Sequence, residues 1–141
     1  MAINVGQRKV NETESTMRCY AVDASMALAE HTIKNCSNEN HFDPKYRDSI
    51  TQALIIMARD AYVKSYIANK IRVTTPEGWQ IRKKLQLDAI YNTMAMVPLI
   101  NLARRLNHLR RGKTEHWIKL SIEARDLLKK WHAADVKRYE N

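Results

Sequence analysis

The sequence predicts an all-α protein, an antiparallel up-down four-helix bundle with a long third helix. The 141 residues include only 3 Gly and 3 Pro, fewer than strands joined by tight turns require. Apolar residues recur every three or four positions over long stretches, which is the spacing of one helix face. Short links separate these stretches, so neighbouring helices should run antiparallel. We expect a flexible tail at residues 1–12 and a single bundle domain at 13–141.

The third helix is predicted over residues 77–111. Thr75 and Pro76 supply an N-cap and a first helical residue whose missing N–H needs no partner. Gly112 predicts the end of the helix, because glycine readily takes the positive φ of a C′ residue. Pro98 lies inside the helix and predicts a kink rather than a division into two helices.

The middle of this helix, from Ala89 to Ala103, carries no charge and is apolar on more than one face. One face holds Leu85, Ala89, Met96, Ile100 and Ala103. A second face holds Leu87, Ile90, Met94 and Val97. A helix that is apolar on several faces is buried on several faces. We therefore expect the second face to be the contact surface of a homo-oligomer.

The other three helices are predicted from start signals and apolar stripes. The first should run from Asn11 to a Ser/Asn-rich turn at 35–40, with a stripe of Met17, Tyr20, Ala24, Ala27 and Leu28. The second should begin at Asp43-Pro44 and end near Arg72. Its expected buried residues are Tyr46, Ile50, Ala53, Leu54, Met57, Ala61, Ala68 and Ile71. The fourth should follow a cap at Thr114 and end near Arg138, with a stripe of Trp117, Leu120, Ala124, Leu127, Leu128, Trp131 and Ala134.

Catalytic and metal-binding patterns are missing from the sequence. No Glu has a His three residues further on, as a di-iron bundle would need. There is no glycine-rich phosphate loop, no nucleophile elbow and no tight acidic cluster for two metal ions. His31 ends the first apolar stripe and is predicted to lie at the edge of the core. We expect a protein that is not an enzyme and has no cofactor or metal.

The sequence also bears on the compartment. Cys19 and Cys36 have no metal or redox spacing and read as buried thiols in a reducing environment. No signal peptide is recognisable, and the uncharged run at 89–103 is shorter than the ~20 residues of a membrane span. We expect a cytoplasmic protein without membrane contact.

The positive charge is concentrated in the second half of the chain. Residues 1–70 hold 9 Lys+Arg against 8 Asp+Glu, whereas residues 71–141 hold 15 against 7. Such an asymmetry indicates a polyanionic partner. The predicted phosphate contacts are Arg82, Lys83, Lys84, Arg104, Arg105, Arg110, Arg111, Lys113, Lys129, Lys130, Lys137 and Arg138. Several of them fall in last helical turns, where the helix dipole favours a cation in any case. Trp79 lies beside Arg82 and could stack on a base or pack in the core.

Five short motifs resemble the accessory variability proteins of diversity-generating retroelements. They are the run 40–47 (Asn-His-Phe-Asp-Pro-Lys-Tyr-Arg), Ile67-Ala68-Asn69, Arg82 with Gln86 and Ala89-Ile90, Trp117, and the closing run 131–139. The resemblance covers about residues 17–139. It departs in the first motif, where Asp43 stands between Phe42 and Pro44 although related sequences often read Phe-Pro-Lys.

The resemblance implies a four-helix bundle that assembles into a basic, ring-like homopentamer. It also implies binding to the retroelement reverse transcriptase and to its template RNA or RNA/cDNA. Such a protein supports mutagenic cDNA synthesis without being the polymerase. The ribosome-associated four-helix family shares the fold and is the nearest alternative.

Two further functions remain open from the sequence. The basic patch could bind an acidic protein, in which case the chain would be a helical interaction module without a nucleic-acid role. A DNA-binding regulator is the other possibility, but it would need a short recognition helix after a tight turn, and the predicted helices are too long.

Overall fold

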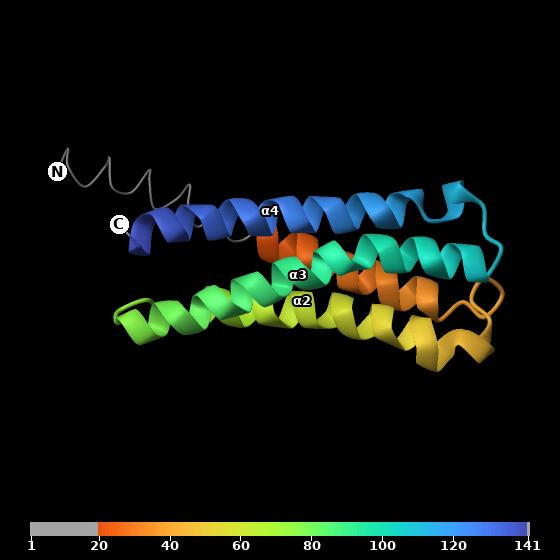
Figure 1. Ribbon diagram of the computed structural model, residues 1–141, viewed down its shortest axis with the longest axis horizontal. Helices are drawn as coiled ribbons and strands as arrows, with labels where there is room; N and C mark the ends of the chain where they lie inside the picture. Colours follow the sequence, from red (N-terminus) through yellow and green to blue (C-terminus); the bar gives the residue numbers. More distant parts are fainter. Residues whose placement is uncertain (1–19, 141) are drawn as a thin grey trace.

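A computed structural model describes residues 20–140, which form helices and no strand. The first helix continues to residue 36 and is followed by α2 (Gln52–Lys70), α3 (Pro76–Leu106) and α4 (Glu115–Tyr139). Consecutive helices run in opposite directions along the long axis (Figure 1). The predicted all-α four-helix fold is confirmed. The tail at 1–12, the helix start at Asn11, Met17 and Cys19 lie outside the described residues.

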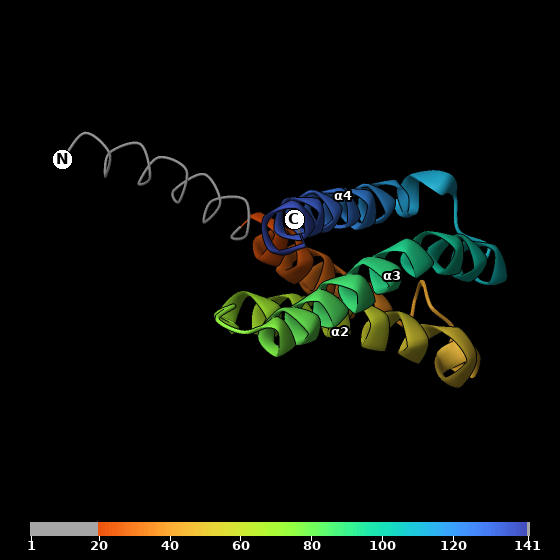
Figure 2. The same cartoon turned by 60° about the vertical axis from the view of Figure 1, so that its left-hand side comes forward.

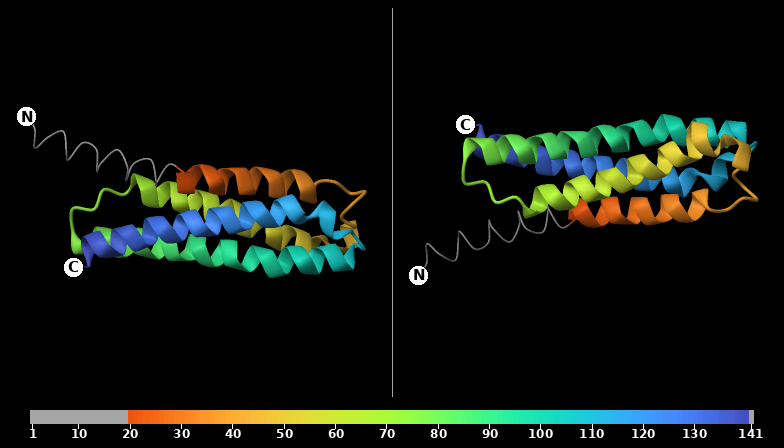
Figure 3. Two further views of the ribbon diagram at one scale, coloured as in Figure 1. Left: turned by 90° about the horizontal axis from the view of Figure 1, so that it is seen from above. Right: turned by 90° about the horizontal axis from the view of Figure 1, so that it is seen from below.

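The helices form a four-membered arrangement in which each lies between two neighbours. Figure 2 shows α3 between α2 and α4, and these two helix pairs make extensive contacts. From above and below, the first helix and α3 lie on opposite sides of α4 and α2 (Figure 3). Within residues 20–140, no helix combines the length and apolar character needed to cross a membrane.

The third helix begins as the sequence predicts. The Thr75 hydroxyl accepts a hydrogen bond from the Gly78 N–H at 3.0 Å, and Pro76 is the first helical residue. The helix then continues for 31 residues, through Pro98, so this proline does not divide it.

The predicted end of this helix is wrong: α3 stops at Leu106 rather than at residue 111. His108 takes the left-handed conformation with φ 54°, whereas no glycine among the described residues has positive φ. The Leu109 N–H bonds to the Arg104 carbonyl at 2.9 Å and the His108 N–H to the Arg105 carbonyl at 3.2 Å, which is a Schellman motif. Leu109 then packs against the core, which favours a turn at this point. Gly112 lies instead in a short 3₁₀ helix, η3 (Arg111–Lys113).

The second helix has a composite start. The Asp43 carboxylate accepts from the Lys45 N–H at 3.0 Å and caps a 3₁₀ turn, η1 (Pro44–Tyr46), as the Asp-Pro signal predicts. A π-helical turn, η2 (Arg47–Thr51), comes before the α-helical residues. The Asp43 N–H donates to the Asn107 side chain at 2.8 Å. This bond ties the start of the second helical segment to the end of α3.

Two clusters of buried side chains form the core. The larger includes Leu28, Leu54, Ile100 and Trp117; the smaller, which lies further toward the end where α3 begins, includes Ala68, Ala89, Ile90 and Trp131. The stripes of α2 and α4 are buried or half-buried as predicted.

The predicted stripe of the first helix is partly wrong. Tyr20 is 58% exposed and Ala27 is exposed, whereas Ser25 and Thr32 are buried. The Ser25 hydroxyl donates to the Ala21 carbonyl, and the Thr32 hydroxyl accepts from the Trp117 indole N–H, each at 2.8 Å. Because their hydroxyls are hydrogen-bonded, these small polar residues can face the core.

Candidate functional site

The predicted phosphate contacts divide between two ends of the bundle. Lys83, Lys84, Lys129, Lys130, Lys137 and Arg138 lie toward the end where α3 begins and α4 ends. Arg104, Arg105, Arg110, Arg111 and Lys113 lie at the other end, around the link from α3 to α4 (Figure 1). At 1.5 Å per residue, Lys83 and Arg104 are separated by ~31 Å along the helix.

Arg82 does not belong to this surface, and its assignment as a phosphate contact is corrected. Its side chain is 2% exposed, and its Nε donates to Oδ2 of Asp135 at 2.9 Å. Nη2 approaches the same oxygen at 2.7 Å as an ion pair, and Nη1 donates to the Ile71 carbonyl at 3.2 Å. The guanidinium therefore joins α3 to α4 and to the segment after α2.

A polar network surrounds this buried pair. The Gln86 amide N–H donates to Oδ2 of Asp135 at 2.7 Å, and the Gln86 carbonyl oxygen lies 2.8 Å from His132 Nδ1. Burial lowers the pKa of His132, and the Lys83 ammonium lowers it further, whereas the Asp135 and Glu140 carboxylates oppose the shift. The sequence interpretation missed Asp135, although its position four residues after Trp131 places it on the buried stripe of α4.

Trp79 packs within the fold and is not exposed for stacking on a nucleic-acid base. Its side chain is buried, its indole N–H donates to Glu140 at 3.1 Å, and its ring lies 5.1 Å from that of Tyr139. Glu140 also pairs with Lys83. Lys83 therefore already has a partner at this end, whereas Lys84, Lys129 and Lys130 are exposed and make no ion pair among residues 20–140.

Four further cations lie at the other end, around the link from α3 to α4. Arg105, Arg110, Arg111 and Lys113 are exposed. Within residues 20–140, none of their charged groups has an ion pair or a side-chain hydrogen bond. The neighbouring cations Lys45 and Arg47, by contrast, pair with Asp43 at 3.7 Å and Glu39 at 3.4 Å. We call the exposed set of Arg105, Arg110, Arg111 and Lys113 the link cluster.

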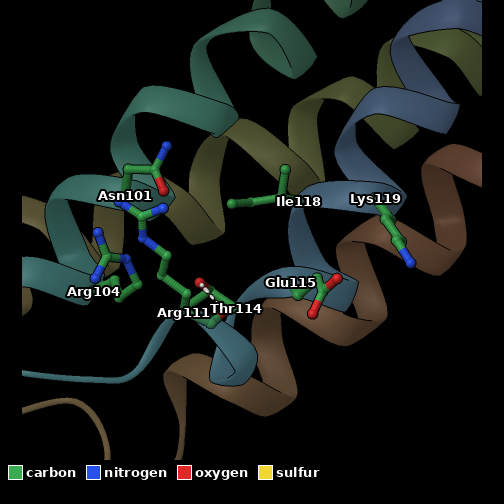
Figure 4. A pocket seen from close by; sticks show the side chains of 7 residues that line it. All are labelled: Asn101, Arg104, Arg111, Thr114, Glu115, Ile118 and Lys119. Carbon is green, nitrogen blue, oxygen red and sulfur yellow. Dashed lines mark hydrogen bonds between the residues drawn. The ribbon is translucent and has the colours of Figure 1, made fainter.

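A cavity of about 620 Å³ opens beside the link cluster, between α3 and α4 (Figure 4). It is lined by Asn101 and Arg104 from α3, Arg111 from η3, and Thr114, Glu115, Ile118 and Lys119 from the start of α4. Arg104 is half-buried, and its Nε–H is buried without a hydrogen-bond partner. Sequence reasoning missed Asn101, Thr114 and Lys119 here, because it placed the end of α3 at residue 111 and so put Arg111 in the helix rather than in the link.

Only some residues of the predicted oligomer face are exposed in the protomer. Ile90 is 4% exposed and packs in the smaller core cluster, so its assignment to an interface is corrected. Met94 is 43% exposed, and Leu87 and Val97 are half-buried. Other large apolar side chains of α2 and α3 are also exposed. They are Ile56, Val63, Tyr66, Ile67, Ile81, Tyr91 and Leu102, and we call them the outer apolar residues of α2 and α3.

The histidine and cysteine residues do not assemble a metal site in the described part of the chain, where no three His, Cys, Asp or Glu side chains converge. His31 lies half-buried at the edge of the core, with its ring 5.0 Å from His116 and 6.4 Å from Trp117. Cys36 is half-buried, and burial raises the pKa of its thiol to about 12. Such a thiol is a poor nucleophile.

Comparisons of the chain with models of known families, with curated proteins and with solved structures returned no match.

Proposed function

We propose that this protein is a basic, non-catalytic RNA-binding accessory subunit of a retroelement reverse transcriptase. In this role a homopentamer binds the template RNA or RNA/cDNA and the reverse transcriptase, and supports mutagenic cDNA synthesis in the cytoplasm. The proposal draws on the sequence resemblance and on the all-α bundle, which is the fold that the resemblance implies.

The observation that carries the nucleic-acid part of the proposal is the link cluster. Exposed arginines and lysines in folded proteins commonly lie near carboxylates, as Arg47 and Lys45 do here. The link cluster has no such partner among the described residues, so its positive potential is directed to solvent. Phosphates neutralise such groups and release counterions, which gives tight binding at low salt with little sequence preference.

Assembly would multiply this surface. In a ring, each copy would present the same cluster around one axis, so one RNA could contact several copies at once. The exposed apolar residues of α3, including Met94 and Tyr91, support contact between copies, because burial of their side chains in such a contact would be favourable.

A salt titration of RNA affinity tests the nucleic-acid part. Two charge-matched variants distinguish the two ends of the bundle: Arg105→Gln/Arg110→Gln/Lys113→Gln at the link, and Lys84→Gln/Lys129→Gln/Lys130→Gln toward the opposite end. Each loses three exposed cations. We expect the link variant to flatten the slope of log K against log[salt] by up to about 2, since each lost contact to single-stranded RNA contributes ~0.7. Equal slopes for both variants and wild type would contradict the assignment.

The reverse-transcriptase part needs its own experiment. A reverse transcriptase encoded beside this gene, with paired repeat regions, should co-elute with the protein and make more cDNA in its presence. The link variant should bind the enzyme normally but stimulate it less. No co-elution, and no effect on cDNA synthesis, would leave an RNA-binding protein of another system, such as the ribosome-associated one.

A helical interaction module is the second candidate, and the outer apolar residues of α2 and α3 favour it. These seven side chains, including Ile67 at 43% and Tyr91 at 60% exposed, are available for a protein partner. Binding through them would depend weakly on salt, because burial of apolar area is the driving term. Retained RNA binding with a steep salt dependence would argue against a purely protein-binding role.

A further inference from the structure

The strongest unassigned feature is the cavity between the end of α3 and the start of α4, lined by Arg104 and Arg111 (Figure 4). Like charges that line one cavity repel one another, and an anion bound there would reduce this repulsion. Neither of these arginines has an ion pair among residues 20–140. With Lys119, three cations line the cavity, and none of them has an ion pair among the described residues.

The cavity lining also includes a buried hydrogen-bond donor that has no acceptor. Arg104 donates from Nη1 to the Leu109 carbonyl at 3.4 Å, a long bond, while its Nε–H is buried with no acceptor. A buried donor without a partner is costly, and an oxyanion that enters the cavity would remove this cost. Arg111 extends from η3 toward the Asn101 side chain, whose amide adds a further donor (Figure 4).

The only acidic side chain that lines the cavity does not neutralise the arginines. Glu115 lies on the far side of Thr114 from Arg104 and Arg111, and it makes no ion pair with either (Figure 4). Thr114 is the N-cap of α4, but its hydroxyl donates to the Arg111 carbonyl at 3.3 Å and gives no cap bond to the helix. The first N–H groups of α4 thus contribute positive potential that no cap side chain offsets.

We propose that this cavity is a binding site for a single phosphate group. Arg104 and Arg111 would hold the phosphate oxygens through charge-assisted hydrogen bonds, and Asn101 would donate a neutral one. At about 620 Å³ the cavity has room for a nucleotide as well as for its phosphate. The phosphate comes either from an RNA strand, which rests on the proposed function, or from a free nucleotide, which does not.

The test uses the full chain, inorganic phosphate and adenosine monophosphate as probes, and NMR detection of the arginine Nε–H and backbone N–H signals. Both probes should shift the Arg104 Nε–H signal and the signals of Thr114 and Glu115. Arg111→Gln should weaken binding at least about tenfold. The matched control is Arg72→Gln, which removes the same charge from an exposed arginine that neither lines the cavity nor belongs to the link cluster, and it should change affinity less than twofold.

Two further variants guard against misfolding. Arg111→Lys keeps the charge but loses the planar fork, so binding should be intermediate, and Asn101→Leu should weaken it at unchanged net charge. Equal losses for Arg111→Gln and Arg72→Gln, with Asn101→Leu like wild type, would overturn the site and show that only the net charge of the protein matters. That result would leave the proposed RNA binding intact.

An oligouridylate without terminal phosphates identifies the source of the phosphate. Competition between this RNA and adenosine monophosphate for the Arg104 signal would place an internal RNA phosphate in the cavity. Nucleotide binding without competition would support the site as one for a free phosphate ester, while counting against the proposed RNA contact at this end. No shift of the Arg104 signal with any probe would overturn the site.

Discussion

Asp135 and Arg82 form a buried ion pair between α4 and α3, with the carboxylate oxygen 2.9 Å from Nε and 2.7 Å from Nη2. The two side chains are 7% and 2% exposed, so water screens their attraction little. The pair is completed by Gln86 and by the Ile71 carbonyl. Because all these groups depend on one another, the loss of a single member leaves buried charge without compensation.

We therefore expect Asp135→Ala to lower the free energy of unfolding by about 3–5 kcal/mol. The double variant Arg82→Met/Asp135→Leu should recover much of this loss, because it removes both charges together. Urea unfolding measures both. The control is Asp88→Ala, which breaks a half-exposed pair with Lys64 at 3.6 Å and should cost less than about 1 kcal/mol. Similar losses of unfolding free energy for Asp135→Ala and Asp88→Ala would mean that the buried pair contributes no more to stability than the half-exposed one.

Met94→Glu should reduce assembly without unfolding the protomer. Met94 is 43% exposed, so a carboxylate there stays hydrated in the monomer but would be buried in a contact between copies. Light scattering should report smaller particles at unchanged helicity by circular dichroism. Ile90→Glu is the matched comparison: Ile90 is 4% exposed, and a carboxylate there should unfold the protomer. If Met94→Glu assembles like wild type, this part of α3 is not a contact surface.

His108→Gly should stabilise the fold by up to about 1 kcal/mol, because glycine adopts positive φ without the Cβ clash that an L-residue meets. The exposed His108 has φ 54°. His108→Val should destabilise, since a β-branched residue is disfavoured in this conformation. Thermal unfolding of the two variants provides the measurement. A loss of stability with glycine would show that the His108 side chain contributes more than its backbone strain costs.

Stability should fall as the pH drops below the ordinary histidine value of 6.5. Burial lowers the pKa of His132 and of His31 in the folded state, so the unfolded chain binds more protons in this range. The contribution is fully present above pH 6.5 and is lost as the pH falls through the folded pKa. Urea midpoints at pH 7.5 and 5.5 should differ less in His132→Gln than in wild type.

The loss of stability caused by histidine protonation should occur at higher pH than any loss caused by protonation of carboxylates. The pKa of Glu140 is lowered, first by its hydrogen bonds from Lys83 and Trp79, so its protonation acts below the ordinary value of 4.5. An NMR titration of the His132 ring should show a midpoint below 6.5. A midpoint at or above 6.5 would contradict the expected direction.

The sequence predicted the helices better than the site, for a physical reason. Helix starts are local, and the Thr75 and Asp43 signals placed two of them correctly. The end of α3 was missed because His108, rather than a glycine, takes the left-handed conformation. A sequence shows charge but not burial, so it does not reveal that Arg82 is buried against Asp135.

The cavity at the link could not be predicted for a related reason. It needs Arg104 near the end of one helix and Arg111 in the turn before the next, and their approach depends on how the link folds back. The Schellman motif at His108 sets that path. A misplacement of five residues at the end of α3 was enough to hide the site, because each residue turns a helix by about 100°.

The buried Arg82–Asp135 pair also constrains the order in which the helices can pack while the chain is being synthesised. A ribosome makes Arg82 well before its counter-ion, which follows 53 residues later. Until α4 has emerged, the start of α3 cannot bury its guanidinium against α2 without an uncompensated charge. The early helices should therefore stay loosely associated on the ribosome, where a chaperone or a second nascent copy could reach their apolar faces, and they should close only when the last helix arrives.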